Sequence, residues 1–283
     1  KAEAGLMMSD NTLDHVIESC ESYLLTDDNN FMVDTFNNRL DTLPDLTEEE
    51  KNAYRQQNLD MLKNHFVPAY QLLIDGLNEL RGTGINDKGL CGYPKGKEYY
   101  EYLVYSATGS SYASIEDLLK DMELMMNKQL GTTSLLLRFH PELIDQLDTF
   151  SYRQTEPGDI MEELKTLSLE EFPSLPECSY TLKTVPKSLE SSLSPAFYLV
   201  SPIDDYQNNV IFINQNPRFS SNELYNTIAH EGYPGHLYQN VYFHTHCNSN
   251  IRNLLSFKGY SEGWATYVEH LSYTLDNGLS PEM

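Results

Sequence analysis

Two histidines and a glutamate lie in one short segment of the chain, which reads AHEGYPGH from Ala229 to His236. Imidazole nitrogens are among the ligands that zinc takes in proteins, and a glutamate beside a zinc ligand can remove a proton from an attacking water. These residue types in this order indicate a metal site that hydrolyses a substrate. His230 and His236 are the candidate ligands, and Glu231 is the candidate general base.

The spacing of the two histidines is unusual for a site on one helix. In the zinc motif HExxH the histidines are four residues apart, about 40° around the helix, so that both reach one ion. Here they are six residues apart, which is about 240° around an unbroken helix. Pro234 removes an amide donor, and Gly235 can take conformations closed to other residues. We therefore expect a bulge or kink between the histidines that returns His236 to the ion.

A catalytic zinc site needs a third protein ligand, and the segment GYSEGWATYVE, residues 259–269, offers a glutamate for this role. The segment predicts a helix that starts near Ser261 and stops before Gly278. Glu262 lies in its first turn and is the expected third metal ligand. Glu269 follows two turns later on the same face, where it would orient a ligand histidine or receive a substrate amine.

Other interpretations of these residues stay open. Glu262 and Glu269 alone could form a solvated helix face. His244 and His246 form a rival pair, since on a strand they would share a face, although the preceding helical pattern favours an exposed helix end. The four cysteines of the chain show no CxxC spacing, and the glycine-rich segment 82–96 lacks the order of a phosphate-binding loop.

A helix start and a pair of strands are expected to position the metal site. Ser220 and Glu223 have the spacing of a capping box, which predicts a helix that runs on to His230. The runs 197–200 and 210–213 are short and rich in β-branched and aromatic residues. They predict an antiparallel hairpin.

Substrate contacts are expected on this hairpin and on the second helix. An extended peptide could add to the edge of the strand at 210–214, with Asn214 fixing its end, while the alternative is a structural strand packed over the motif helix. Tyr260 and Tyr267 are candidate donors to the oxyanion. With 20 tyrosines in the chain, residue type alone does not single them out.

Helical patterns dominate the rest of the chain. Apolar residues follow helical spacing through residues 11–80, and a second capping signal at 114–117 opens a helix whose leucine and methionine stripe is expected to be core. Prolines punctuate the polar stretch 156–195. We expect a helical scaffold region at 1–195 and a zinc-site region at 196–283. The predicted fold is mainly α (α+β), a bundle-like helical scaffold with a small antiparallel sheet beside a zinc-binding helix pair.

The charge and composition of the chain limit the classes of partner that it can bind. The chain has 42 acidic and 19 basic residues and a net charge of -23, which argues against a nucleic acid or an anionic membrane as partner. It has no run of 18 apolar residues, so no transmembrane segment is expected. The acidic, tyrosine-rich composition favours an exported or lipid-anchored bacterial protein over a cytoplasmic one, although four free thiols would suit a reducing cytosol equally well. The oligomeric state is open.

The two motifs together resemble the bacterial domain-of-unknown-function 885 family, whose members are viewed as zinc metallopeptidases. The family's HExxPGH motif is matched at 230–236 and its EGWAxYxE motif at 262–269. The resemblance implies a largely helical fold with a small sheet beside the zinc, His230 and His236 as ligands, Glu231 as general base and Glu262 as third ligand. Many members carry a second histidine where this chain has Leu237, so that position is not expected to be an essential ligand.

Members of the family usually carry helical regions beyond both ends of the segment that this chain matches. The chain therefore resembles an internal piece of a longer member, and donors to the transition state are expected outside it. The function we expect is hydrolysis of peptide bonds by a zinc-activated water with Glu231 as base, with low activity for this piece alone. The alternatives are a metal-containing peptide-binding module without turnover and a metal-free helical interaction domain. Substrate sequence, substrate length and exo or endo action are open.

Overall fold

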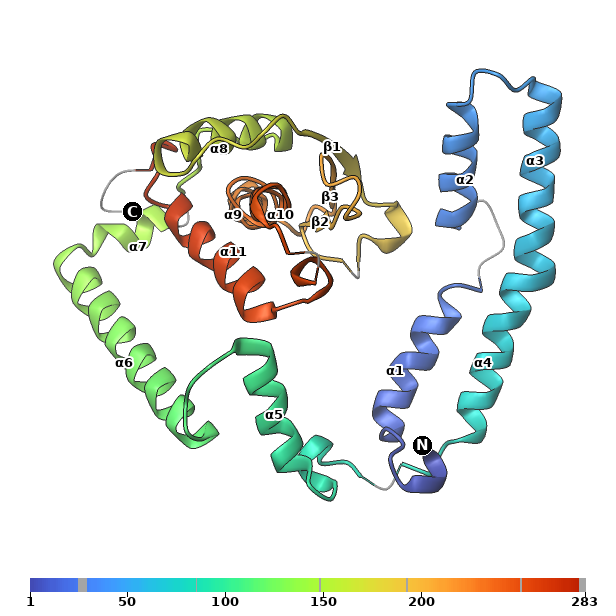
Figure 1. Cartoon of the computed structure of the whole chain (residues 1–283), viewed down its shortest axis with the longest axis horizontal. Coiled ribbons are helices and arrows are strands. Elements are labelled where there is room, and N and C mark those ends of the chain that lie inside the picture. The colour runs from blue at the N-terminus through green and yellow to red at the C-terminus, as the bar shows by residue number, and fades with distance from the viewer. Residues whose placement is uncertain (25–29, 85, 148, 192, 250, 280–283) are drawn as a thin grey trace. The chain divides into compact units, whose positions relative to one another are not determined.

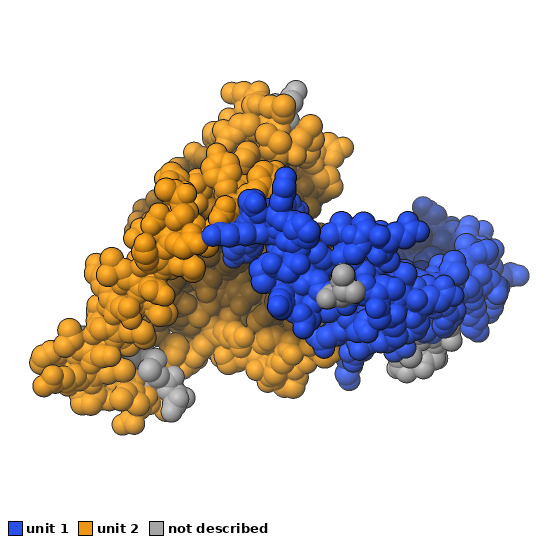
Figure 2. Space-filling model, turned by 90° about the horizontal axis from the view of Figure 1, so that it is seen from below, with its two compact units in different colours: residues 1–100, 186–189 blue, residues 101–185, 190–283 orange. Residues whose placement is uncertain are grey.

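The computed structural model describes residues 1–24, 30–84, 86–147, 149–191, 193–249 and 251–279. The chain forms two compact units, blue and orange in Figure 2, which are residues 1–100 with 186–189 and residues 101–185 with 190–283. The segment 156–185 shares a core with the two helices that carry the histidines. The whole candidate metal site lies in the second unit.

The first unit is built mainly from helices, and the first three of those named below begin at side-chain caps. α1 spans Asp10–Glu21, α2 Phe31–Asp41, α3 Glu48–Met61 and α4 Val67–Glu79, with a π-helical stretch at Leu62–Phe66 between the last two. The caps Ser9, Asn30 and Thr47 each accept an amide hydrogen of the first turn, which the helix itself leaves unsatisfied. The helical pattern of residues 11–80 is thus confirmed. α1 packs on α4 through a small core of Met7, Leu13, Ile17, Cys20 and Ile74.

Three further helices follow along the chain, α5 (Gly96–Thr108), α6 (Ile115–Phe139) and α7 (Glu142–Leu147). Ser114 caps α6 as predicted by accepting the Asp117 amide at 3.1 Å. The stripe on α6 is not core, however, since Leu119, Met122 and Met125 are exposed and α6 buries no side chain against the described residues. The prediction was wrong because helical periodicity shows which side chains share a face, not whether another element covers that face.

A three-stranded sheet forms one wall of the second unit. Its strands are β1 (Ser179–Thr184), β2 (Ala196–Leu199) and β3 (Asn208–Ile213), in the order β1-β3-β2. The predicted antiparallel pair is confirmed as β2 and β3, with Phe197 opposite Phe212. β1 runs parallel to β3 and lies in a stretch that the sequence marked only as polar. The sheet is therefore mixed rather than purely antiparallel.

The strand order corrects the expected substrate edge. β3 is the central strand and is paired on both sides, so an extended peptide cannot add to residues 210–214. β2 is an outer strand and, among the described residues, pairs with β3 alone. The outer side of β2 pairs with no strand of the described residues, although its Tyr198 N–H is bonded to Glu231. The available edge therefore lies on β2 rather than on β3.

Four further helices belong to this unit, namely α8 (Pro157–Glu171), α9 (Ser221–Glu231), α10 (His236–His246) and α11 (Lys258–Ser272). α9 packs on β2, and the other three pack on α9. In Figure 1, α9 and α10 are seen nearly end-on between α8 and α11, with the sheet beside them. Their shared core includes the fully buried side chains of Ile160, Met161, Leu164, Ile211, Tyr225, Ile228, Leu237 and Val241. Burying each such side chain contributes roughly 1.5–3 kcal/mol, so α9 and α10 are firmly anchored where they meet.

The fold class is confirmed as mainly α with a small β component. None of the helices in the described ranges combines the length and the apolar character that a membrane crossing requires.

Candidate metal centre

The helix that carries the first histidine ends one residue after it. Ser220 caps α9 as predicted, since its hydroxyl accepts the Glu223 amide at 3.1 Å. The second histidine, His236, is the first residue of α10. The break expected between His230 and His236 is present, and it separates two helices rather than kinking one.

Gly235 is the residue that this break requires. A Cβ atom at its position would lie 1.8 Å from the carbonyl oxygen of His230 and 2.4 Å from that of Ala229, far inside any allowed contact. The preceding peptide, Tyr233–Pro234, is cis. The close approach lets the chain turn back against the end of α9 and brings the His230 and His236 ring centroids to 4.8 Å.

Trp264 ties the second motif to the break. Its indole Nε1–H donates to the carbonyl oxygen of Pro234 at 2.8 Å, and its ring packs on Phe172 and Tyr238. The bond joins α11 to the turn between α9 and α10, so it fixes the distance from Glu262 to the histidines. We did not assign this role from the sequence, although the single tryptophan of the chain lies inside the EGWA motif.

The three predicted ligands converge. His230 Nε2 and His236 Nε2 each lie 3.6 Å from the same oxygen, Oε2 of Glu262, and one ligand atom from each residue lies within 4.8 Å of the others. A tetrahedral zinc with bonds of about 2.0–2.1 Å separates its ligand atoms by roughly 3.4 Å. The donors therefore fit zinc in chemistry and spacing, and a set of two histidines and one carboxylate is typical of catalytic zinc with a position left open.

Glu269 orients His230. Its Oε2 lies 3.1 Å from His230 Nδ1, and because an ionised carboxylate can only accept, the proton of the neutral ring sits on Nδ1. The lone pair of Nε2 then points toward Glu262. Of the two roles expected for Glu269, orienting a ligand histidine is the one that its contact supports.

The electrostatics of His236 favour the form that binds metal. Burial, and next the neighbouring His230, lower the pKa of His236, while the carboxylate of Glu262 opposes this shift. A neutral imidazole has a lone pair to donate, whereas an imidazolium has none. His236 therefore favours the form whose lone pair a metal ion could take.

Glu231 lies beside the ligands but is held by another group. The backbone N–H of Tyr198, on the outer strand β2, donates to Glu231 Oε2 at 2.9 Å. Burial raises the pKa of Glu231, while this hydrogen bond and His230 lower it. The contribution of Tyr198 was not anticipated, because a backbone donor on a distant strand leaves no signal in residue types.

Two predicted substrate residues are not placed for that role. Asn214 is buried, and its amide donates to the carbonyl oxygens of Glu190 and Leu193 at 2.9 and 3.0 Å. Its expected role at the end of a substrate is therefore wrong, because both amide hydrogens are used within the fold. Tyr267 packs its ring on Trp264 and does not line the cavity at the histidines. Tyr260 does line it.

The rival pair His244 and His246 does not converge. Both lie on α10, and residues two apart on a helix point to nearly opposite faces. His244 stacks on Tyr206 with ring centroids 5.5 Å apart, and His246 stacks on Tyr242 at 4.1 Å. Within the described ranges, neither belongs to a cluster that could hold a metal.

A cavity of about 960 Å³ opens onto the metal cluster. His230, Glu231, His236 and Glu262 lie in its wall, together with Phe197 and Tyr198 of β2. This volume is at the upper end of the about 300–1,000 Å³ that ligand pockets occupy. The metal cluster, the candidate base and the outer strand thus share one binding space.

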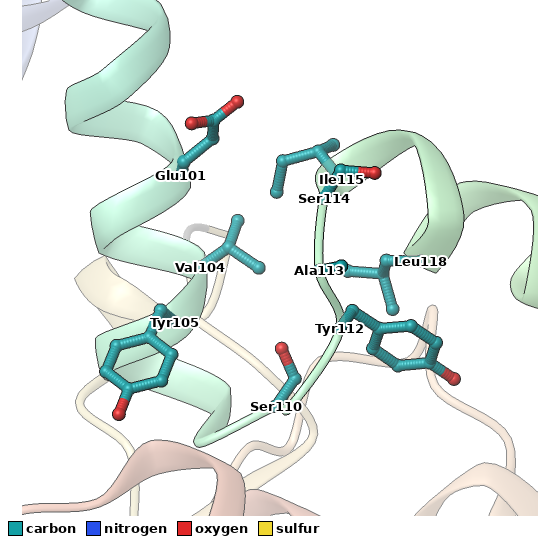
Figure 3. A pocket seen from close by; sticks show the side chains of 9 residues that line it. All are labelled: Glu101, Val104, Tyr105, Ser110, Tyr112, Ala113, Ser114, Ile115 and Leu118. Carbon is teal, nitrogen blue, oxygen red and sulfur yellow. The ribbon is translucent and has the colours of Figure 1, made fainter.

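A second hollow, of about 180 Å³, lies between α5 and the start of α6, and Figure 3 shows its lining. Glu101 and Tyr105 line it from α5, and Tyr112 and Leu118 line it from the other side. It is smaller than the about 300 Å³ at which ligand pockets begin, and in the part of the chain that the structure describes it gathers no set of metal ligands. The cavity at the histidines is therefore the candidate functional site.

Comparisons with known proteins place the chain in a family and give the same fold. A solved structure described as "The crystal structure of the putative lipoprotein from Colwellia psychrerythraea" matches with a TM-score of 0.78 at 18% identity, over 95% of this chain and 50% of that one. This likeness shows the fold alone, and the chain spans about half the length of that protein. No curated relative matches closely enough to be compared. The family model for "Bacterial protein of unknown function (DUF885)" matches residues 1–281, and the chain therefore belongs to that family.

Proposed function

We propose that the protein is a zinc-dependent peptidase. The observation that carries the proposal is the convergence of His230, His236 and Glu262 on one small volume, with Glu231 beside them in the wall of a large cavity. Two histidines, one carboxylate and an adjacent glutamate are the parts that metal-assisted hydrolysis of an amide needs.

The chain's own residues would hold and shape the metal site. His230, His236 and Glu262 would bind the ion, which when bound supplies Lewis acidity to a water molecule and to a peptide carbonyl. Glu269 keeps the His230 ring in its orientation by accepting the Nδ1 proton. Gly235 lets His236 reach the same point from the next helix.

Glu231 would transfer the proton in the reaction. Its Oε2 is held by the Tyr198 amide, so the carboxylate keeps one orientation in the cavity wall. It takes a proton from the attacking water and delivers it to the leaving amine as the C–N bond breaks. One water is consumed, and the products are a carboxylate and an amine.

The outer strand β2 gives the substrate a place to lie. Phe197 and Tyr198 line the cavity, and β2 has no strand partner on its outer side among the described residues. An extended peptide can add along such an edge through main-chain hydrogen bonds, except at the Tyr198 N–H, which is bonded to Glu231. This alignment would bring a peptide carbonyl alongside Glu231.

The decisive experiment measures metal and turnover on the wild-type protein and on Glu231→Gln. The purified protein is incubated with zinc and dialysed, bound metal is measured by mass spectrometry, and a peptide library is digested and analysed for new termini. We expect about one zinc per chain in both proteins. Cleavage by Glu231→Gln should be at least about 100-fold slower, since glutamine keeps the size of the side chain but cannot accept the proton.

Each alternative has its own outcome. Bound zinc with no cleavage of any library peptide would favour a metal-containing peptide-binding module. Absence of bound metal would favour a metal-free helical interaction domain and refute the proposal. Equal cleavage by wild type and Glu231→Gln would leave the metal site in place and remove Glu231 as the base.

We also propose that the intact protein is exported or lipid-anchored. The support is the description of the matching solved structure as a lipoprotein, together with the acidic composition of this chain. Fractionation of cells that express the full-length protein checks this, and recovery in the cytoplasmic fraction alone would contradict it.

A further inference from the structure

The cavity wall away from the metal ligands is apolar and exposed. Large side chains with half or more of their surface open to solvent include Val200, Leu254, Leu255 and Phe257, and all four line this cavity. Single exposed apolar residues are common, but several in the wall of one cavity indicate a surface that a ligand covers. The ligand that fits this wall carries apolar side chains.

Outside the candidate metal site, the charged side chains of the same wall are all positive. Apart from Glu231 and Glu262, the charged side chains that line the cavity are those of Arg252 and Lys258, both basic. This is unexpected in a chain with 42 acidic and 19 basic residues. Burial lowers the pKa of His244, which favours the uncharged form of this third basic side chain.

Arg252 and Lys258 are available to a ligand. Within the described ranges, neither side chain has a carboxylate at ion-pair distance. The Arg252 guanidinium lies 5.4 Å from the centroid of the Phe243 ring, which holds it against the cavity wall. A guanidinium presents a planar fork that matches a carboxylate with two hydrogen bonds, whereas a lysine offers a point charge. Arg252 is therefore the better carboxylate ligand of the two.

We propose that Arg252 binds the free C-terminal carboxylate of a short peptide whose apolar side chains cover the wall formed by Val200, Leu254, Leu255 and Phe257. The terminal carboxylate is the one negative charge that an apolar peptide always carries. Such a peptide therefore matches both the apolar side chains of the wall and its positive charge. The inference rests on the proposed peptidase function, and it makes the substrate a peptide cleaved near its C-terminus.

The test compares two forms of one peptide. An N-acetylated pentapeptide of phenylalanine, leucine and alanine is made with a free carboxyl terminus and as the amide. Binding of each to the zinc-loaded Glu231→Gln protein is measured by calorimetry, so that no peptide is consumed. We expect the acid to bind about tenfold or more tightly than the amide, the gain typical of a hydrogen-bonded ion pair. In Arg252→Gln this preference should disappear through weaker binding of the acid alone.

Matched variants locate the effect. Arg138→Gln removes the same charge from α6, outside the cavity, and should leave the acid-to-amide ratio unchanged. Loss of the preference in Lys258→Gln but not in Arg252→Gln would overturn the assignment to Arg252. A preference that survives in Arg252→Gln would assign the carboxylate to the metal and overturn the inference. Equally tight binding of an amide peptide with an internal aspartate would overturn the terminal assignment.

Turnover separates this inference from the proposed function. If the wild-type protein cleaves the acid and the amide with equal kcat/KM, and both bind equally, the C-terminal anchor is wrong while the peptidase proposal stands. If neither these peptides nor any library peptide is cleaved but the acid preference depends on Arg252, the peptidase proposal fails while the carboxylate site stands.

Discussion

Glu269 is not one of the three candidate ligands, but its contact with His230 should affect how tightly a metal would be held. Its carboxylate fixes the proton of His230 on Nδ1, so Glu269→Gln keeps the contact but loses its charge. Replacing such partners of ligand histidines typically costs about 10–100-fold in metal affinity. We expect a zinc dissociation constant raised by this factor, as measured by competition with a chelator. Glu123→Gln on α6 is the control and should bind zinc like the wild type.

Substitutions in the two histidine pairs should have opposite effects on the zinc content. His236→Ala removes one of three convergent ligands and should reduce bound zinc to a small fraction of one per chain. His244→Ala removes a ring that stacks on Tyr206 outside the cluster, so zinc content should stay near that of wild type. Metal analysis after dialysis checks both variants. Equal losses in the two would place the metal at the rival pair.

Residues of the candidate site could be predicted from the sequence where the residue type itself limits the chemistry that the side chain can perform. The structure brings His230, Glu231 and Glu262 together as predicted, because candidate metal ligands and bases come from few residue types at recognisable spacing. Asn214 was misassigned, because an amide beside a predicted site can equally serve the fold, and here it donates to two backbone carbonyls. The Tyr198 amide was missed, because every residue but proline carries the same donor.

The turn between α9 and α10 depends on the absence of one side chain. Gly235→Ala would place a Cβ atom 1.8 Å from the His230 carbonyl oxygen, so the backbone must move and carry His236 with it. We expect a loss of at least about 2 kcal/mol in the free energy of unfolding, in the range of overpacking and backbone strain, together with weaker zinc binding. Denaturant unfolding and zinc titration measure the two effects.

Gly263→Ala is the matched control for this change. Gly263 lies within α11, next to Glu262, and a Cβ atom there would meet no other atom within 4 Å. Alanine is favoured over glycine in a helix by about 0.8–1.0 kcal/mol, so this variant should gain stability and keep its zinc affinity. Gly235→Ala with wild-type stability and zinc binding would show that the turn can relax and that its glycine is not required.

The elements were predictable where a local signal agreed with the final packing. Ser220 and Glu223 gave the start of α9, and the Pro-Gly pair gave its end, since caps and helix breakers act within one turn. β1 was missed because only Tyr180 and Leu182 of its residues are even half-buried, so its apolar alternation is weak. Its pairing with β3 is set by contacts distant in sequence.

The net charge of -23 should act on every charged ligand that approaches the protein. We expect an amide peptide with two internal aspartates to bind the Glu231→Gln protein more weakly than the same peptide with two asparagines. The difference should be large at about 10 mM salt, where charges act on one another over a Debye length of about 30 Å. The difference in binding should shrink at about 150 mM salt, where the Debye length falls to about 8 Å. Calorimetric titrations of both peptides at the two salt concentrations measure it. A ratio that does not change with salt would show that local contacts, and not the overall charge, set the difference.

The hydrogen bond from Trp264 to Pro234 also has an optical consequence. The chain contains a single tryptophan, so excitation at the red edge of the near-ultraviolet absorption band, where tyrosine does not absorb, excites the indole of Trp264 alone. This indole lies at the turn that carries His236, where it is partly buried against Phe172 and Tyr238. Any rearrangement of the turn changes the solvent around the indole and hence the wavelength and intensity of its emission. The protein therefore carries a natural fluorophore at its candidate metal centre, and metal titrations can be followed without a label.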